Sequence, residues 1–452
     1  MRLGVLATAG CLVALVAPAA AEGGTPPIGF SAPVIVIPSP PGGESTAPVA
    51  EPHMAVASSG RVFVSAGYES WDCETGRVSA ALRDCVWASD NDSTFHVRGG
   101  EPDGDGGDNT DLAVMPSGTV LESTMTDPDI AGATLGSGTL GATVSRSADG
   151  GHTWTEVVDA NHQVVSDRPY LLVAADNNLL LTFAPLPGGI WAVRSTDGGA
   201  SFGAAFPIAL GTIAVNGSPL DDHVRGDLVV PFATSSLPTC VSGFDACFNQ
   251  LAVARSDNGG QSWTTETVAD LPSGIGITGP PIATADAGGA EYIVFGTAAY
   301  TDAGEAAPVG PAHVWVVRSP AAGKPWSAPI EIDPPGGSAM MPAGVAAGRG
   351  HLAVVFYRTA DPNGEDDTTA SWNVMVASSG DAGSRFAQTL VARGAYLGAG
   401  YNRVPILIDQ IDIAFDPKGR VLIVWTDTHK LQGTANTIDF AHQTTGPPLA
   451  DY

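Results

Sequence analysis

The stretch Ser147-Ala148-Asp149-Gly150-Gly151-His152-Thr153-Trp154 returns along the chain and decides the fold. It recurs at 195–202 (STDGGASF) and 256–263 (SDNGGQSW), and weaker copies occupy 319–326 (SPAAGKPW) and 379–386 (SGDAGSRF). The first serines are 48, 61, 63 and 60 residues apart, a near-constant period that is typical of repeat architectures. A short apolar run precedes each copy, so the predicted unit is a strand, a tight turn and an aromatic side chain.

The residue types in this stretch explain why it forms a turn. Asp or Asn accepts hydrogen bonds from backbone N–H groups two residues on, and glycine supplies the positive φ that the turn requires. The aromatic side chain folds back over the turn and buries apolar surface. None of these groups needs a substrate, so we interpret the following residues as structural: Asp149, Trp154, Asp197, Phe202, Asn258, Trp263, Asp381 and Phe386.

The pattern Ser-x-Asp-x-Gly-x-Thr-Trp resembles the Asp-box of the BNR-repeat, sialidase-like (neuraminidase-like) β-propellers. The resemblance implies a propeller fold and an exo-sialidase-like glycoside hydrolase. Sialidases also carry an arginine triad, an early Arg-Ile-Pro motif, a tyrosine nucleophile activated by Glu and an acid/base Asp. Here Glu51-Pro52-His53 stands where the family motif would place arginine, and Asp167-Arg168-Pro169 comes a blade or two later.

The catalytic set of that family is therefore not evident in this chain. Tyr401 with Arg403, or Tyr357 with Arg358, could supply a tyrosine and a carboxylate-binding arginine, but no flanking motif supports either pair. Two functions stay open. One is a secreted sialidase-like hydrolase acting on glycans, and the other is a noncatalytic propeller that binds carbohydrate or protein.

Composition and a second repeat predict the architecture. The chain has 56 Gly, 35 Pro and only 15% charged residues, as in turn-rich all-β proteins. Apolar runs suited to strands covered on both faces recur seven times, at 62–64, 120–121, 179–181, 228–230, 292–295, 352–356 and 421–425. We expect an all-β, single, seven-bladed propeller, with the six-bladed sialidase type as the alternative. Because an open ring would expose strand edges, residues 34–37 should complete the last blade.

The predicted organisation is a signal peptide (1–21), a Pro/Gly-rich segment with the closing strand (22–50), the propeller (51–445) and a short tail (446–452). Residues 1–21 combine Arg2, an apolar core and an Ala-Ala-Ala exit, which predicts cleavage near Ala21 and a secreted, extracellular or periplasmic protein. Two local disulfides fit that location, Cys73 with Cys85 and Cys240 with Cys247.

The net charge of −27 argues against a nucleic-acid partner, which requires a basic surface. No later apolar run is long enough to span a bilayer. We expect a monomer that meets a glycan or another extracellular ligand.

Polar residues mark the beginnings of several predicted innermost strands, which line the channel of a propeller. The candidate catalytic cluster is Asp111, Asp167, Arg168, Asp222, His223 and Asp409, and the candidate binding residues are Glu51, His53, Tyr170, Tyr401 and Arg403. Gln410 and Asp412 extend the last of these beginnings, whereas 278–281 and 340–342 carry no charge. Converging carboxylates and histidines suit general acid/base work or a cation site. Polar residues that only solvate a water-filled channel are the alternative.

The loop at 103–108 offers Asp103, Asp105 and Asp108 on a glycine-rich frame. Such oxygen ligands suit Ca²⁺, although the terminal bidentate Glu of an EF-hand is missing. A weak Ca²⁺ site and an ordinary acidic surface loop both stay open, and no other cofactor is expected.

Overall fold

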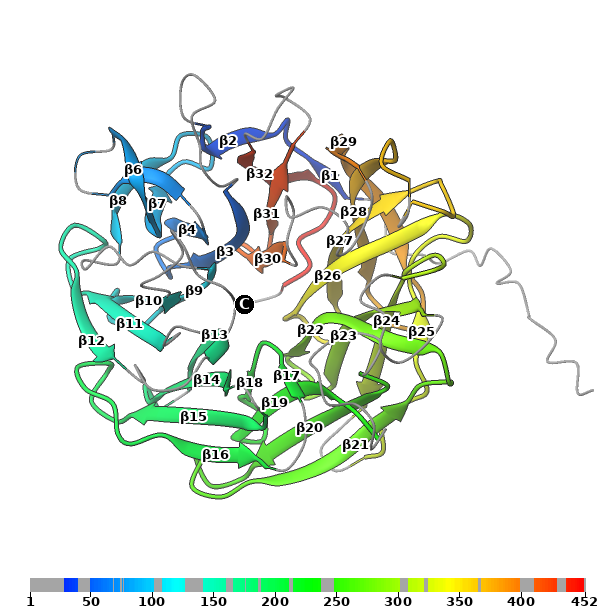
Figure 1. The fold of residues 1–452 in the computed structure, drawn as a ribbon, viewed down its shortest axis with the longest axis horizontal. Coiled ribbons are helices and arrows are strands. Elements are labelled where there is room, and N and C mark those ends of the chain that lie inside the picture. The colour runs from blue at the N-terminus through cyan, green and yellow to red at the C-terminus, as the bar shows by residue number, and fades with distance from the viewer. Residues whose placement is uncertain are drawn as a thin grey trace, which may run out of the picture.

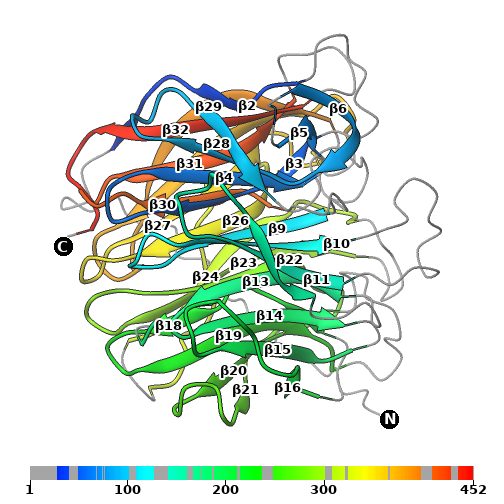
Figure 2. The ribbon, with the colours of Figure 1, turned by 90° about the vertical axis from the view of Figure 1, so that its left-hand side faces the viewer.

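The computed structural model describes residues 28–450 except 40–48, 68, 74, 76, 101–107, 127–140, 160–165, 175, 186–187, 211–213, 237–247, 301–307, 321–323, 365–366, 399–409 and 429–435. Every regular element in the described residues is a β-strand. The strands form seven antiparallel sheets arranged as blades in a ring (Figure 1), and Figure 2 shows the blades from the side.

In blades 1 to 6 the strands follow one another from the axis outward in chain order, and blade 7 adds amino-terminal strands outside its last strand. Blades 1 to 3 comprise β3 (Ala50–Val56), β4 (Val62–Gly67), β7 (Cys85–Ser89) and β8 (His96–Gly100); β9 (Asp108–Val114), β10 (Val120–Thr126), β11 (Gly141–Ser147) and β12 (Thr155–Asp159); and β13 (Ser166–Val173), β14 (Leu179–Pro185), β15 (Ile190–Ser195) and β16 (Phe206–Ala209). A separate hairpin, β5 (Glu69–Asp72) and β6 (Arg77–Arg83), leaves blade 1 between β4 and β7.

Blades 4 to 7 repeat this order. They comprise β17 (Ala214–Asn216) with β18 (Leu220–Asp222), β19 (Asp227–Thr234), β20 (Gln250–Ser256) and β21 (Thr264–Asp270); β22 (Ile275–Ala285), β23 (Glu291–Ala299), β24 (His313–Ser319) and β25 (Ile330–Glu331); β26 (Ser338–Ala346), β27 (Leu352–Thr359), β28 (Ser371–Ser379) and β29 (Ala387–Leu397); and β30 (Asp412–Phe415), β31 (Val421–Asp427) and β32 (Thr437–Thr445).

The amino-terminal segment closes the ring. Strands β1 (Gly29–Phe30) and β2 (Val34–Ile37) both pair antiparallel with β32, and Val34 lies opposite Phe440. The predicted seven-bladed propeller with an amino-terminal closing strand is therefore confirmed, and the six-bladed alternative is wrong.

The apolar runs fill the spaces between neighbouring blades. All seven residues of β31 are buried, because both faces of the strand pack against other blades. Val36 and Ile37 of the closing strand join Leu422 and Val424 of blade 7 and Val62 of blade 1 in one apolar cluster. Full burial of each such side chain contributes about 1.5–3 kcal/mol, so closure makes the two ends of the chain part of one core.

The repeated turn joins the third and outer strands of five blades. In the first copy Ser147 Oγ donates to Asp149 Oδ1 at 2.8 Å, and the Thr153 N–H donates to Asp149 Oδ1 at 2.9 Å. Gly150 and Gly151 adopt φ values of 73° and 93°, which glycine tolerates without strain. The hydrogen bonds from Thr153 and Ser147 hold the pKa of Asp149 below its usual range.

Blade 1 carries a related turn whose sequence differs from the repeated pattern. At 89–95, the Thr94 N–H donates to Asn91 Oδ1 at 2.9 Å, and Ser89 Oγ also bonds this oxygen at 3.1 Å. The weak copy in blade 5 differs, because Ser319 Oγ donates to the carbonyl of Lys324 at 2.9 Å. All these turns close hairpins between the third and outer strands of their blades.

Cys73 and Cys85 form a disulfide with a Cα–Cα distance of 5.2 Å. It ties the end of β5 to the start of β7, as the sequence predicts. Cys240 and Cys247 lie outside the described residues. The described part of the chain contains no helix with the length and apolarity needed to cross a membrane.

Candidate active site in the channel

A backbone irregularity recurs near the start of the innermost strands. The residue at this point has a positive φ in five blades: Glu51 (57°), Asn109 (53°), Arg168 (56°), Gly279 (71°) and Met341 (53°). The pairing register with the second strand shifts at each of these places. Such bulges re-aim side chains and are frequent next to active sites, and positive φ is costly for residues other than glycine.

The residue two places after the first bulge, His53, lies at the centre of a polar cluster. Its Nδ1 lies 3.3 Å from Oδ1 of Asp111 and 4.0 Å from Oδ2 of Asp412. Its Nε2 contacts Oε1 of Gln410, and the ring of Tyr170 meets it edge-on with centroids 5.9 Å apart. Residues from four adjacent blades therefore meet around one imidazole.

The amide of Gln410 determines which atom faces Nε2 of His53, on the side of the ring away from the carboxylates. Its Nε2 donates to Oδ1 of Asn109 at 2.7 Å, which leaves Oε1 to face the histidine. Both ring nitrogens of His53 thus face acceptors, one amide oxygen and one carboxylate. A neutral imidazole has a single N–H, so it can donate to only one of these two acceptors.

The two carboxylates are held in the same way. Asp111 accepts the N–H of Leu112 at 2.8 Å and that of Leu171, in the next blade, at 2.7 Å. Asp412 accepts its bonds from Ile413 and from Met54 of the next blade, both at 2.7 Å. Each carboxylate therefore links neighbouring innermost strands and has a fixed orientation.

Asp412 differs from an ordinary surface carboxyl in its acidity. Burial raises its pKa to about 6, an effect that the nearby His53 partly opposes. Its side chain keeps 22% of its exposure and that of Asp111 keeps 13%. Asp412 can therefore hold a proton at mildly acidic pH and still be reached from a cavity.

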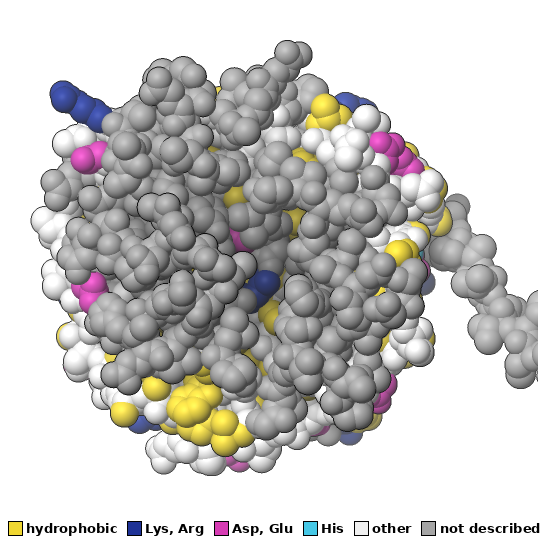
Figure 3. Space-filling model, in the orientation of Figure 1, with side chains coloured by type: hydrophobic (Ala, Val, Ile, Leu, Met, Phe, Trp, Pro, Cys, Tyr) yellow, Lys and Arg dark blue, Asp and Glu magenta, His cyan; other side chains and the backbone are white. Residues whose placement is uncertain are grey.

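That cavity has a volume of about 190 Å³, and its titratable residues lie on one side only. His53, Asp111, Tyr170, Gln410 and Asp412 line one side, and the other side is lined by Ser218, Pro280, Ile282, Pro342 and Ala343. Figure 3 shows acidic and basic side chains in the hollow at the middle of the ring. All seven blades line the cavity, and its titratable side chains come from blades 7, 1, 2 and 3.

Other predicted site residues lie beside this cluster. Glu51 is fully buried and accepts the Asn109 N–H at 3.2 Å. Arg168 occupies the bulge of blade 3, and its carbonyl accepts a bond from Asn216 at 2.7 Å. The side chains of Asp108 and Asp167 lie outside the described part of the structure, as do Asp103, Asp105, Tyr401, Arg403 and Asp409.

The prediction that Asp222 and His223 point into the channel is wrong. They lie at the turn from β18 into β19, where Asp222 accepts the Val224 N–H at 3.0 Å. His223 is 70% exposed beside Asp221. The innermost strand of blade 4 is split, and Asn216, Gly217 and Ser218 occupy the channel end instead. A Cβ on Gly217 would lie 1.7 Å from the carbonyl oxygen of Pro281, so the two backbones touch at the split.

Tyr357 also lies away from the channel. It is fully buried between blades 6 and 7, its hydroxyl donates to the carbonyl of Thr426 at 2.8 Å, and burial raises its pKa well above the usual value. Arg358 points to the carbonyl of Gly336. This pair does not form the tyrosine and arginine site considered from the sequence.

The sequence reasoning overlooked Asn109 and Ser218. A usable signal was present, because Glu51-Pro52, Arg168-Pro169, Gly279-Pro280 and Met341-Pro342 mark the same bulge in four blades. Aligning the other blades on these pairs would have placed Asn109 at the bulge of blade 2.

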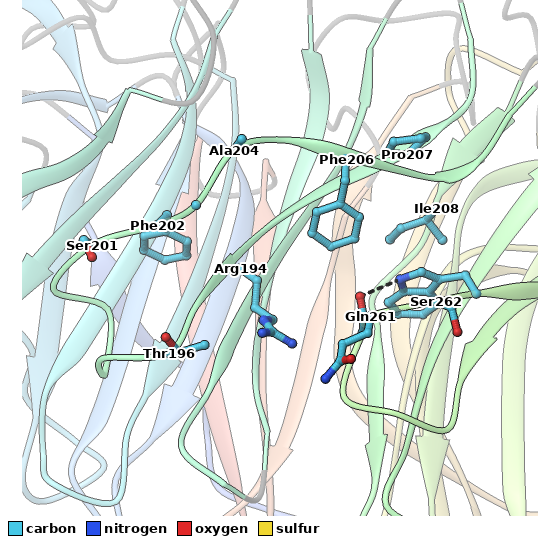
Figure 4. A pocket seen from close by; sticks show the side chains of 13 residues that line it. Arg194, Thr196, Ser201, Phe202, Ala204, Phe206, Pro207, Ile208, Gln261 and Ser262 are labelled. Carbon is cyan, nitrogen blue, oxygen red and sulfur yellow. Dashed lines mark hydrogen bonds between the residues drawn. The ribbon is translucent and has the colours of Figure 1, made fainter.

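A larger groove, of about 750 Å³, lies on the outside of the ring between blades 3 and 4. Figure 4 shows its lining, where Phe202 and Phe206 stand near Arg194, Gln261 and Ser262. Its lining has no carboxylate or histidine, so it offers no acid/base pair.

No protein-family model matches the chain, and no curated protein matches it in sequence. Solved structures do match its fold. A polysaccharide lyase of family PL25, an ulvan lyase, is 11% identical with a TM-score of 0.54, over 92% of this chain and 94% of that one. The α-L-arabinanase of Penicillium chrysogenum is 11% identical, with a TM-score of 0.50 over 91% and 98%. The α-L-arabinofuranosidase of Fusarium graminearum is 13% identical, with a TM-score of 0.50 over 91% and 97%.

At such identities the likeness shows the fold alone. By their descriptions these neighbours are carbohydrate-active enzymes. Membership of the sialidase-like family is not confirmed, and that resemblance still depends on the repeated turn.

Proposed function

We propose that this protein cleaves glycans by acid/base chemistry at the channel cluster. The observation that supports this most is His53 held between Asp111 and Asp412, which come from different blades and meet at a cavity. Similarity of fold to enzymes that act on arabinan and ulvan supports the substrate class. Most glycoside hydrolases use two carboxylates on either side of the scissile bond.

Each residue of the cluster has its own role in cleavage of the glycosidic bond. Asp412, with its pKa of about 6, donates a proton to the leaving glycosidic oxygen as the C–O bond breaks. Asp111 is the carboxylate that takes the proton from the attacking water, and each of its oxygens keeps a lone pair beyond its backbone bond. The N–H of His53 stabilises negative charge that develops beside them. Tyr170 stacks beside the sugar and closes the cavity wall.

Sialidase activity is a more specific version of this proposal, and the residues of the channel support it less well. Among the described innermost strands Arg168 is the single arginine, whereas sialidases use three for the substrate carboxylate. A neutral or uronate-containing polysaccharide therefore fits these residues better than a sialoside.

A noncatalytic glycan-binding propeller is the second candidate. One observation favours it: each carboxylate accepts two backbone N–H bonds, one of them from the neighbouring blade. In that case Asp111 and Asp412 are structural, and the cavity only binds sugar.

Export is part of the proposed function. The Cys73–Cys85 disulfide and the leader-like residues 1–21 both support an oxidising location. Sequencing the amino terminus of protein recovered from the culture medium tests this, and cleavage near Ala21 is expected.

The activity test uses the mature chain with arabinan, ulvan and sialylated oligosaccharides. New reducing ends would show hydrolysis, and unsaturated products absorbing in the ultraviolet would show elimination instead. His53→Ala should abolish cleavage, and Pro342→Ala, across the same cavity, should retain it. Binding without cleavage would favour the noncatalytic candidate, and equal activity in both variants would contradict the channel site.

A further inference from the structure

A second cluster of titratable side chains lies at the outer edge of blade 5, on the right of Figure 1. His313 begins β24, and Glu331 and Asp333 lie at and just beyond the end of β25, its hydrogen-bonded neighbour. Residues two apart on a strand face the same side, so Glu331 and Asp333 approach His313 together. Its Nδ1 lies 3.2 Å from Oε1 of Glu331 and 3.3 Å from Oδ2 of Asp333.

We propose that His313, Glu331 and Asp333 bind a divalent transition-metal ion, for which Zn²⁺ is the best fit. Tetrahedral Zn²⁺ with bonds of about 2.0–2.1 Å places neighbouring ligand atoms about 3.3 Å apart. The two distances at His313 match that spacing, and the three ligand atoms all lie within 4.8 Å of one another. One nitrogen and two oxygens suit Zn²⁺ with water in the fourth position, whereas Ca²⁺ takes six to eight oxygen ligands.

The charge of this cluster distinguishes it from two others. In those, the carboxylates are paired with arginine: Asp222 and Glu291 contact Arg225, and Asp92 and Asp416 contact Arg420. Within the described residues no lysine or arginine forms an ion pair with Glu331 or Asp333. A bound cation would supply the positive charge that arginine supplies in the other clusters.

The ligands are already oriented by their neighbours. The side chain of Asp333 is only 3% exposed, and its Oδ1 accepts the Val314 N–H at 2.8 Å, which leaves Oδ2 towards His313. The ring of Trp315 packs edge-on against His313 with centroids 6.3 Å apart. Such outer contacts fix ligand geometry and raise metal affinity. Glu331, at 41% exposure, leaves the ion open to solvent.

The test is calorimetric titration of the chelator-treated mature chain with zinc chloride. We expect one site whose affinity falls at least tenfold in both His313→Ala and Glu331→Gln. His223→Ala is the matched control, because His223 lies 3.3 Å from a single carboxylate, Asp221, and this variant should bind zinc as the wild type does. Circular dichroism verifies that each variant is folded.

Cobalt gives a second readout that does not depend on activity. Co²⁺ at this site should show the intense visible absorption of tetrahedral coordination, and His313→Ala should lose it. The proposal is overturned if the wild type binds no zinc at millimolar concentration. It is equally overturned if His313→Ala keeps the site, or if His223→Ala loses as much affinity. The glycan-cleaving function is not used in any of these readouts.

Discussion

The two halves of the inner ring share a backbone and differ in chemistry. Bulges with positive φ occur in blades 1, 2 and 3 at Glu51, Asn109 and Arg168, and also in blades 5 and 6 at Gly279 and Met341. Titratable side chains line the cavity only on the side of blades 7, 1, 2 and 3, whereas Pro280 and Pro342 line the other side. The bulge is therefore a property of the scaffold, and reactivity depends on which residue follows it.

The largest expected effect comes from His53→Ala. Removing the imidazole leaves Asp111 and Asp412 without their shared partner, so glycan cleavage should fall at least about 100-fold, the usual scale of a group that stabilises developing charge. Initial rates at saturating glycan measure this. Pro342→Ala should stay within about threefold of wild type, and a similar loss in both variants would remove the distinction between the halves.

Trp154→Ala sharpens the contrast between the channel and the repeated turns. Trp154 packs against the apolar cluster of blades 1 and 2, and its Nε1 donates to the carbonyl of Gly151 at 2.9 Å. Its loss should lower the free energy of unfolding by about 2–3 kcal/mol, measured by urea denaturation, with glycan cleavage unchanged. The exposed His152→Ala in the same turn should change neither. A specific loss of activity in Trp154→Ala would place the turn in the site.

Asp412→Asn tests the pH dependence of the polar half. Because its folded-state pKa is raised to about 6 by burial, the protonated carboxyl stabilises the fold. That contribution is fully present below the unfolded pKa and is lost as the pH rises through 6. The wild-type free energy of unfolding should fall by on the order of 2 kcal/mol between pH 4 and 7, and the variant should lack this step. An identical profile in the variant would contradict the raised pKa.

Tyr170→Phe should give the smallest effect. The ring that meets His53 at 5.9 Å is kept and only the hydroxyl is lost. We expect cleavage to fall by about three- to tenfold, the scale of one hydrogen bond, mainly in KM. A loss as large as that of His53→Ala would give the hydroxyl a direct part in proton transfer.

Much of the fold could be predicted because its signals are local and periodic. The turn at 147–154 predicts a hairpin, and the apolar run at 421–425 predicts a strand that is covered on both faces. Neither prediction needs information from the rest of the chain. Closure by Val34–Ile37 followed from the cost of an open edge, and the pairing with β32 confirms it.

The channel was harder to predict because it depends on where each innermost strand is bent. Asp111 and His53 were singled out because they lie at the predicted beginnings of innermost strands. Asp222 was misplaced because the backbones touch at Gly217 and Pro281, which splits β17 from β18 and moves the acidic residues to the far end. The His313 cluster depends on the register between β24 and β25, which the weak copy of the repeated turn at 319–326 does not give.

The most direct test of the glycan site is a crystal structure of Asp412→Asn soaked with an oligosaccharide that the wild type cleaves. A sugar ring should lie against Tyr170, with a glycosidic oxygen within hydrogen-bonding distance of residue 412 and His53 on the same side. A sugar held over Pro280 and Pro342, or in the groove between blades 3 and 4, with nothing bound at His53, would contradict the assignment of the reaction to the polar half of the ring.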